Sequence, residues 1–269
     1  MIADNDLLSI QQARILAENA REAQAKLAAF PQETLDAGVE CLAKAIVPHI
    51  RELALMSQEE TGYGNPADKE FKNRFVCEQL PERLRGMRCV GVLNDAADGR
   101  IVEVGVPLGV IVALCPVTSP VSTAIYKTLL AVKSGNAIIF SPHPGATKSI
   151  TRALEILSAA AVSCGLPEGC VSHLRTVTKS GTLELMGHPA TSLLMITGVP
   201  GMFREARCLG KPRVQIAPPH ELHAQRVFAQ TVAAHFVIRV QMSARADSQF
   251  LKFQHSILTF SRSFLLPRR

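Results

Sequence analysis

The chain has 269 residues, of which 47% are hydrophobic and 19% are charged, and its formal net charge is +6. This composition is typical of a globular protein and excludes a wholly disordered chain. The longest apolar runs fall short of the ~20 residues that a membrane span needs, and the acidic start lacks the apolar segment of a secretory signal. We therefore expect a cytoplasmic protein with no membrane partner.

The positive charge is confined to the end of the chain. Residues 213–269 hold eight Lys or Arg, two acids and no glycine, whereas residues 1–212 are neutral and contain all 17 glycines. The body has no basic stripe mixed with aromatic residues, so we expect no nucleic-acid partner. The shift predicts a domain over residues 1–212 and a poorly ordered basic tail over residues 213–269.

Helical spacing of apolar residues predicts that the first ninety residues are helical. Ser9 has the spacing of a capping box, and Asn65 precedes a proline as a helix cap often does. The expected helices cover about 9–30, 32–47 and 48–62, with a fourth starting at 65. On the fourth, the pairs Asp68/Lys72 and Glu70/Arg74 lie one turn apart, which indicates a solvated face.

Strand character begins at Cys89. Residues 89–93 and 100–106 flank an Asp-Gly turn and predict a hairpin. From residue 109 to residue 210, short apolar runs alternate with helical segments, which is typical of a parallel, doubly wound, Rossmann-like sheet. The expected strands are 110–115, 137–140, 171–174 and 192–196, and the expected helices are 120–133, 146–164, 181–186 and 199–209.

The seven cysteines are scattered and never form a C-x-x-C pair. In a chain of this length, such spacing argues against a disulfide framework. We expect most of them to be reduced residues of the core.

Three loops follow expected strands at the edge of the sheet where doubly wound proteins bind ligands. They are residues 116–120, 141–144 and 197–201. Gly198 and Gly201 would let the backbone approach a ligand, and the following helix start favours phosphate. Each loop alone is also explained as a sharp turn, and no G-x-G-x-x-G follows the first strand.

Together the motifs are more specific. They are Gly105-Val106-Pro107-Leu108-Gly109, Cys115-Pro116-Val117-Thr118-Ser119-Pro120, Ser141-Pro142-His143-Pro144, Gly165-Leu166-Pro167, His188-Pro189, Thr197-Gly198-Val199-Pro200-Gly201 and Gly210-Lys211-Pro212. In order and spacing this series resembles the aldehyde dehydrogenase superfamily, and in particular its coenzyme A-acylating branch. The resemblance covers about residues 5–212.

The resemblance implies NAD as cofactor, a small aldehyde and coenzyme A as substrates, and a homo-oligomer. It implies no metal. Thr118 and Ser119 would lie beside the nicotinamide, and Thr197, Gly198 and Gly201 near the pyrophosphate. The loop of Ser141, Pro142 and His143 would adjoin the cofactor, although His143 between two prolines is equally explained by the turn. Lys127 is expected to be structural, with its ammonium group on a carboxylate.

The chemistry of the resembled family also needs a cysteine thiolate well downstream of Gly210-Lys211-Pro212. No cysteine follows Cys208 in these 269 residues. We therefore expect a truncated acylating aldehyde dehydrogenase that binds NAD weakly and lacks turnover. The alternatives are a non-catalytic module that binds a nucleotide or a subunit and, less favoured, a nucleic-acid binder that uses the basic tail. The presence of a catalytic nucleophile is the feature that would distinguish the enzyme from the non-catalytic module.

Overall fold

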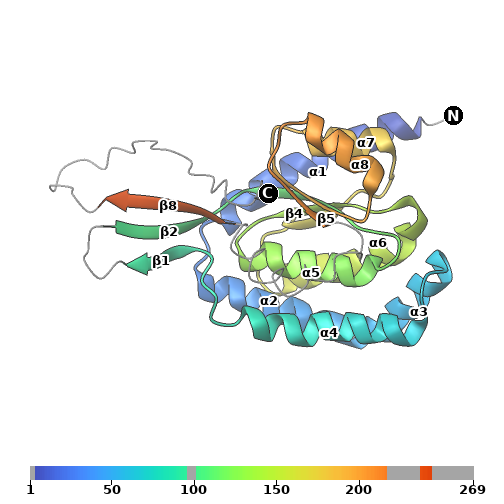
Figure 1. The fold of residues 1–269 in the computed structure, drawn as a ribbon, viewed down its shortest axis with the longest axis horizontal. Helices are drawn as coiled ribbons and strands as arrows, with labels where there is room; N and C mark the ends of the chain where they lie inside the picture. The colour runs from blue at the N-terminus through green and yellow to red at the C-terminus, as the bar shows by residue number, and fades with distance from the viewer. Residues whose placement is uncertain (1–3, 96–100, 217–236, 244–269) are drawn as a thin grey trace, which may run out of the picture.

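The computed structural model describes residues 4–95, 101–216 and 237–243, and Figure 1 shows their arrangement. The helices are α1 (Asn5–Leu27), α2 (Gln32–Ile46), α3 (Ile50–Thr61), α4 (Pro66–Leu84), α5 (Pro120–Lys133), α6 (Thr147–Ser163), α7 (Lys179–Gly187) and α8 (Pro200–Cys208). The strands are β1 (Gly91–Asp95), β2 (Ile101–Pro107), β3 (Val110–Leu114), β4 (Ile138–Ser141), β5 (Val171–His173), β6 (Thr191–Thr197), β7 (Arg213–Ile216) and β8 (Val237–Ser243). Two short 3-10 turns, Val47–His49 and Pro144–Ala146, lead into α3 and α6.

The main sheet has five parallel strands in the order β5-β4-β3-β6-β7. All five residues of β3 are buried, as its unbroken apolar sequence predicts for a central strand covered on both faces. Helices α5 and α6 cover one face, and α1, α7 and α8 lie on the other (Figure 1). The predicted doubly wound parallel sheet is confirmed.

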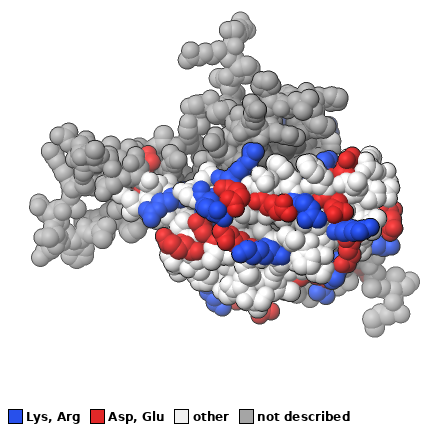
Figure 2. Space-filling view, turned by 90° about the horizontal axis from the view of Figure 1, so that it is seen from below, with Lys and Arg blue, Asp and Glu red and all other residues white. Residues whose placement is uncertain are grey.

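Helices α2, α3 and α4 form an outer layer over α5 and α6 (Figure 1). Figure 2 shows acidic and basic side chains interspersed on the face that this layer presents to solvent. The expected Glu70–Arg74 ion pair is present at 3.2 Å. The expected Asp68–Lys72 pair is not among the ion pairs of the described residues. Asp68 accepts a hydrogen bond from Asn65 at 2.7 Å.

Two glutamine side chains attach the N-terminal helices to the sheet. Gln24 of α1 donates to the carbonyl oxygen of Gly135 at 2.9 Å and accepts from the amide of Ala137 just before β4. Gln32 of α2 accepts from the amide of Cys89 at 2.6 Å, ahead of β1. These side chains satisfy backbone groups that the sheet leaves unpaired, so the helices are fixed in orientation as well as packed.

The hairpin predicted around residues 89–106 is confirmed, because β1 pairs antiparallel with β2. Its Asp98-Gly99 turn lies outside the described residues. Strand β8 pairs antiparallel with the other edge of β2, and β7 extends the parallel sheet beyond Pro212. Two segments of the expected tail are therefore strands, and the domain boundary at residue 212 stays a prediction. The rest of the tail lies outside the described residues.

Two details of the sequence interpretation were wrong. Helix α1 begins before Ser9, because the Asp4 carboxylate caps it by accepting from the amide nitrogens of Asp6 and Leu7. Cys41 of α2 and Cys164 after α6 form a disulfide, so a bridge exists where none was expected. Of the other five cysteines, four are buried and Cys208 is exposed, as expected for a mostly reduced set.

Candidate functional site

The candidate site lies where the connections of the sheet change direction. The chain leaves β3 through α5 on one face of the sheet and leaves the adjacent β6 through α8 on the other face. A crevice between the carboxyl ends of two such strands is the usual ligand site of a doubly wound sheet. The loops at 116–120 and 197–201 are therefore neighbours, as the sequence predicted.

The two loops contact each other through Gly198 and Pro116. Gly198 has φ +66°, and a Cβ built on it would lie 2.6 Å from the Cβ of Pro116. The helices that follow start uncapped, because neither Ser119 before α5 nor Val199 before α8 makes a side-chain cap. Two helix N-termini without side-chain caps therefore meet at this switch point, which fits the charge of a dinucleotide diphosphate. Gly201 is exposed in the first turn of α8, and a Cβ there would meet nothing within 4 Å.

Lys127 lies fully buried beneath these loops. Its Nζ donates to the carbonyl oxygens of Leu114, at 2.6 Å, and Met195, at 2.9 Å, so it connects the ends of β3 and β6. Burial lowers the pKa of Lys127 to about 8. The expected carboxylate partner was wrong, because the ammonium group binds two backbone carbonyls.

Thr197 ends β6 on the same side of the crevice. Its hydroxyl lies 3.3 Å from the hydroxyl of Tyr126, a side chain of α5. Burial raises the pKa of Tyr126, so this phenol stays protonated at neutral pH. The contact fixes the Thr197 side chain against α5 at the end of β6.

The side chains of the loop after β4 make more contacts within the protein itself than the sequence suggested. The Ser141 hydroxyl is buried 2.8 Å from that of Thr182 on α7. The Thr182 hydroxyl donates its one proton to the carbonyl oxygen of Thr178, so Ser141 donates to Thr182 and can only accept from a ligand. Pro142 is buried and His143 is half-buried.

His143 has a turn-forming role in the structure. Its Nδ1 accepts from the amide of Gly145 at 3.0 Å, which requires the tautomer that is unprotonated at this nitrogen. Burial lowers the pKa of His143 and favours the same neutral form. Contact of Ser141, Pro142 and His143 with a cofactor stays a prediction.

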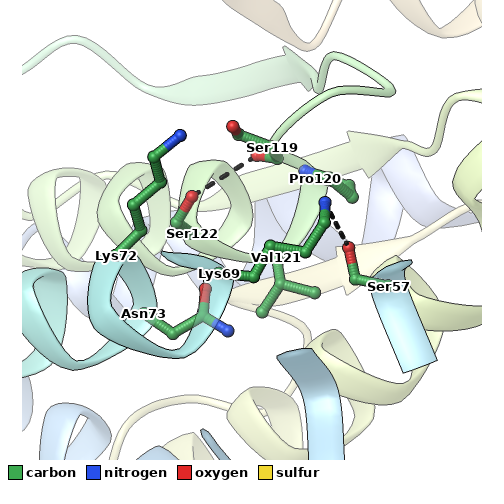
Figure 3. Close-up of a pocket in the computed structure, with 8 residues that line it drawn as sticks. All are labelled: Ser57, Lys69, Lys72, Asn73, Ser119, Pro120, Val121 and Ser122. Carbon is green, nitrogen blue, oxygen red and sulfur yellow. Dashed lines mark hydrogen bonds between the residues drawn. The ribbon is translucent and has the colours of Figure 1, made fainter. Parts of the chain in front are cut away.

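The sequence interpretation missed Lys69. This residue lies in the outer helical layer and binds the loop that follows β3. Lys69 of α4 is buried, and its Nζ donates to the carbonyl oxygen of Thr118 at 3.0 Å and to the hydroxyl of Ser57 at 3.2 Å. The Thr118 side chain itself is exposed. The sequence interpretation assigned Lys72 to a solvated face and singled out neither Lys69 nor Asn73, although all three lie within one turn of the same helix. Figure 3 shows the pocket that these residues line with the start of α5.

The cysteines nearest the site are poor nucleophiles. Cys115 follows β3 directly, but burial raises the pKa of its thiol to about 11. Cys208 is exposed at the far end of α8, roughly 12 Å along the helix from its start. A thiolate is the reactive form of cysteine, so neither thiol combines position with activation. Among the described residues, no three His, Cys, Asp or Glu side chains are grouped as metal ligands, and no helix is long and apolar enough to cross a membrane.

The comparison with protein families decides the assignment. The model of the aldehyde dehydrogenase family matches residues 1–205. The chain belongs to the aldehyde dehydrogenase family. The resemblance inferred from the motif series is thereby confirmed.

The similar proteins are acylating members of this family. The bifunctional aldehyde-alcohol dehydrogenase AdhE of Escherichia coli K12 is 33% identical over 208 residues, covering 77% of this chain and 23% of that protein. Aldehyde-alcohol dehydrogenase 2 of Entamoeba histolytica is 36% identical over 187 residues, covering 70% of this chain and 22% of that protein. The chain therefore spans about a quarter of the length of these curated relatives.

Solved structures give the same result for the fold. An acetylating aldehyde dehydrogenase from Geobacillus thermoglucosidasius has a TM-score of 0.78 and 38% identity, covering 81% of this chain and 48% of that one. A probable aldehyde dehydrogenase from Listeria monocytogenes EGD-e has the same TM-score and 41% identity, covering 80% and 48%. The helical N-terminal region and the parallel sheet are thus those of this family.

Proposed function

We propose that residues 1–212 are the NAD-binding part of a coenzyme A-acylating aldehyde dehydrogenase acting on a small aldehyde. The observation that carries the proposal is the switch point between β3 and β6, where the loops that lead into the uncapped starts of α5 and α8 meet at the Gly198–Pro116 contact. Backbone amides at such helix starts bind phosphate oxygens. Thr118, Ser119, Thr197 and Gly201 border this crevice on the two loops.

The relatives support the substrate class. A propionaldehyde dehydrogenase from Rhodopseudomonas palustris, 25% identical with a TM-score of 0.67, was solved with bound CoA and an acylated cysteine. An engineered glycolyl-CoA reductase of the same fold was solved with NADP+ bound. When bound, NAD would supply the hydride acceptor for aldehyde oxidation. The choice of NAD over NADP, self-association and a cytoplasmic location belong to the proposal.

The proposal includes the absence of turnover by this 269-residue polypeptide. Acyl transfer to coenzyme A needs a cysteine thiolate that forms a thioester with the substrate. Cys115 is buried with a raised thiol pKa, Cys208 lies at the far end of α8, and residues 209–269 contain no cysteine. The purified chain should form no NADH from acetaldehyde, NAD and coenzyme A. Formation of NADH that thiol alkylation abolishes would contradict this part.

Calorimetry tests whether the chain binds NAD. We expect the full chain to bind NAD weakly, with a dissociation constant of about 1 mM, equivalent to about 4 kcal/mol. Gly201→Asp places a negative charge beside the expected pyrophosphate in an open position and should weaken binding about twofold to fivefold. Ile15→Asp on the exposed face of α1 adds the same charge away from the crevice and serves as the control. Equal affinities of both variants and the parent chain would contradict the site.

A module that binds a nucleotide or a subunit without catalysis is the second candidate. The burial and raised thiol pKa of Cys115 and the position of Cys208 at the far end of α8 favour it. Mixing the chain with a polypeptide that carries the catalytic cysteine distinguishes the two candidates. If the chain contributes to an acylating dehydrogenase, a complementary polypeptide that carries the cysteine should restore NADH formation on mixing, whereas a pure binding module should not respond.

A further inference from the structure

The fold brings together two cysteines that lie 123 residues apart in the sequence, Cys41 on α2 and Cys164 at the end of α6. The other five cysteines, all within the described residues, are Cys77, Cys89, Cys115, Cys170 and Cys208. Four of these are buried, and the exposed one lies on α8, on the opposite face of the sheet from α2 and α6 (Figure 1). Reversible bridge formation is therefore restricted to the first pair.

Both sulfur atoms lie near the protein surface. Cys41 and Cys164 are half-buried, and the residues on either side of Cys164, Ser163 and Gly165, are exposed. Val162, two residues before Cys164, is 51% exposed. Partial exposure is what a cysteine needs in order to react with small reagents, so the bridge is accessible in the folded chain.

The two cysteines are held close by contacts that do not need the bridge. Helix α6 ends in a turn in which the amide of Gly165 donates to the carbonyl oxygen of Val162 at 3.0 Å. This turn places the buried side chain of Leu166 against Gly38, where a Cβ would lie 3.1 Å from Cδ2 of Leu166. Gly38 lies one turn before Cys41 on α2. Because this packing is independent of the S–S bond, the thiols stay neighbours after reduction.

The bridge lies in the less firmly attached half of α2. In the first half, Gln32 accepts from the amides of Cys89 and Val90 at 2.6 and 3.0 Å. Asp36, one turn later, pairs with the buried Lys133 at 2.6 Å. Position 41 lies beyond these polar contacts, in the second half of the helix, where the bridge adds a covalent link to α6. Opening the bridge should therefore loosen the second half of α2 and leave the first half attached.

We propose that Cys41 and Cys164 form a reversible redox site, which exchanges with small thiols and disulfides such as glutathione and controls how firmly α2 is held on α6. In the cytoplasmic location that belongs to the proposed function, thiols are kept reduced and a disulfide is usually catalytic or redox-sensing. Only this cellular setting rests on the proposed function. The exchange itself is measured on the purified chain without NAD, so failure of NAD binding would not affect it.

Oxidation of the site proceeds by two thiol–disulfide exchanges. The thiolate of one cysteine attacks a small disulfide, forms a mixed disulfide and releases one small thiol. The sulfur of the other cysteine then displaces the remaining half as a second small thiol and closes the bridge. The small disulfide thereby gains the two electrons and two protons that the cysteine pair loses, and excess small thiol reverses both steps.

Equilibration of the full chain with mixtures of reduced and oxidised glutathione tests the exchange, with the bridged fraction measured by alkylation and mass spectrometry. A bridge that stabilises the folded chain is itself favoured by folding. The ratio of thiol squared to disulfide at half oxidation should therefore be roughly 30-fold to 5,000-fold higher for the native chain than in urea. Equal ratios in the two states would overturn the proposal. So would a native bridge that excess glutathione fails to reduce.

Two serine variants check the assignment. Cys208→Ser removes an exposed thiol on the other face of the sheet and should leave the half-oxidation ratio unchanged. Cys41→Ser should lose the internal bridge and leave Cys164 as a mixed disulfide with glutathione. An internal bridge from Cys164 in this variant, or a changed ratio in Cys208→Ser, would contradict the proposed pair.

Hydrogen exchange measures the control of α2. Reduction of the parent chain should remove protection from the second half of α2 and from the turn after α6, while the central strand β3 keeps its protection. Unchanged exchange in α2 would show that the bridge does not control this helix. Loss of protection in β3 as well would show that reduction unfolds the chain. Either result would overturn the proposal of a reversible switch.

Discussion

Gly198 and Pro116 fit together so closely that a side chain at position 198 would collide with the proline, since a Cβ there would lie 2.6 Å from the Cβ of Pro116. The left-handed φ of +66° at Gly198 adds a conformational requirement for glycine. Pro116 follows β3 and Gly198 follows β6, so one contact sets the separation of the two loops at the crevice. The motif series suggested Gly198 as a neighbour of the cofactor. The structure shows that the packing of the two loops already requires a glycine at this position.

The two glycines of the 197–201 loop should respond in opposite ways to alanine. Gly198→Ala is expected to lower the free energy of unfolding by about 2–4 kcal/mol, because a left-handed backbone and a steric clash act together. Gly201→Ala has open space in the first turn of α8 and should raise it by up to about 1 kcal/mol. Urea unfolding of both variants measures the difference. Similar losses in both would show that the loop does not have this geometry.

The strands and helices could be predicted because local patterns specify them. The unbroken apolar run of β3, the proline after Asn65 and the glycine that ends α3 each act within a few residues. The partners of Lys127 and Lys69 could not be predicted, because they are backbone carbonyls brought near by tertiary packing. The neighbouring loops after β3 and β6 followed from strand order, whereas the pocket between α4 and α5 depends on how these two helices pack in the folded chain.

The carboxylate of Glu60 should be a measurable source of stability. It accepts from the Lys148 amide at 2.7 Å, from the Ser149 amide at 2.8 Å and from the Ser149 hydroxyl at 2.7 Å, and so caps α6 from α3. Glu60→Ala should lower the free energy of unfolding by about 1–2 kcal/mol, the usual cost of a lost N-cap. Glu59→Ala on the exposed side of α3 is the control for loss of an acid. Equal urea midpoints for the two variants would disprove the capping role.

The disulfide between Cys41 and Cys164 should make stability depend on redox conditions. It joins α2 to the end of α6 across 123 residues, and its removal frees a long loop in the unfolded chain. Reduction should lower the free energy of unfolding by up to about 5 kcal/mol. A double variant with Cys41→Ala and Cys164→Ala should respond to a reductant no further. If the parent chain unfolds at the same urea concentration with and without reductant, the bridge is absent in solution.

Lys127 should give the folded chain a characteristic pH dependence. Burial lowers its pKa from 10.5 to about 8, so between these pH values the unfolded chain holds a proton that the folded chain has lost. Raising the pH then favours the folded state, and stability from this group should rise from pH 8 to pH 10.5 and stay constant below pH 8. The neutral amine keeps two N–H donors for Leu114 and Met195, so its hydrogen bonds persist.

The comparison of the parent chain with Lys127→Met isolates this contribution. The methionine variant leaves the two carbonyl oxygens without a donor and should be less stable at every pH, by about 1–3 kcal/mol per unsatisfied group. Its deficit should grow as the pH rises above 8, because only the parent chain gains from deprotonation. Lys148→Met is the matched control for the loss of a lysine. A deficit that stays constant from pH 7 to pH 10 in urea unfolding would show that the buried ammonium group keeps its proton throughout that range.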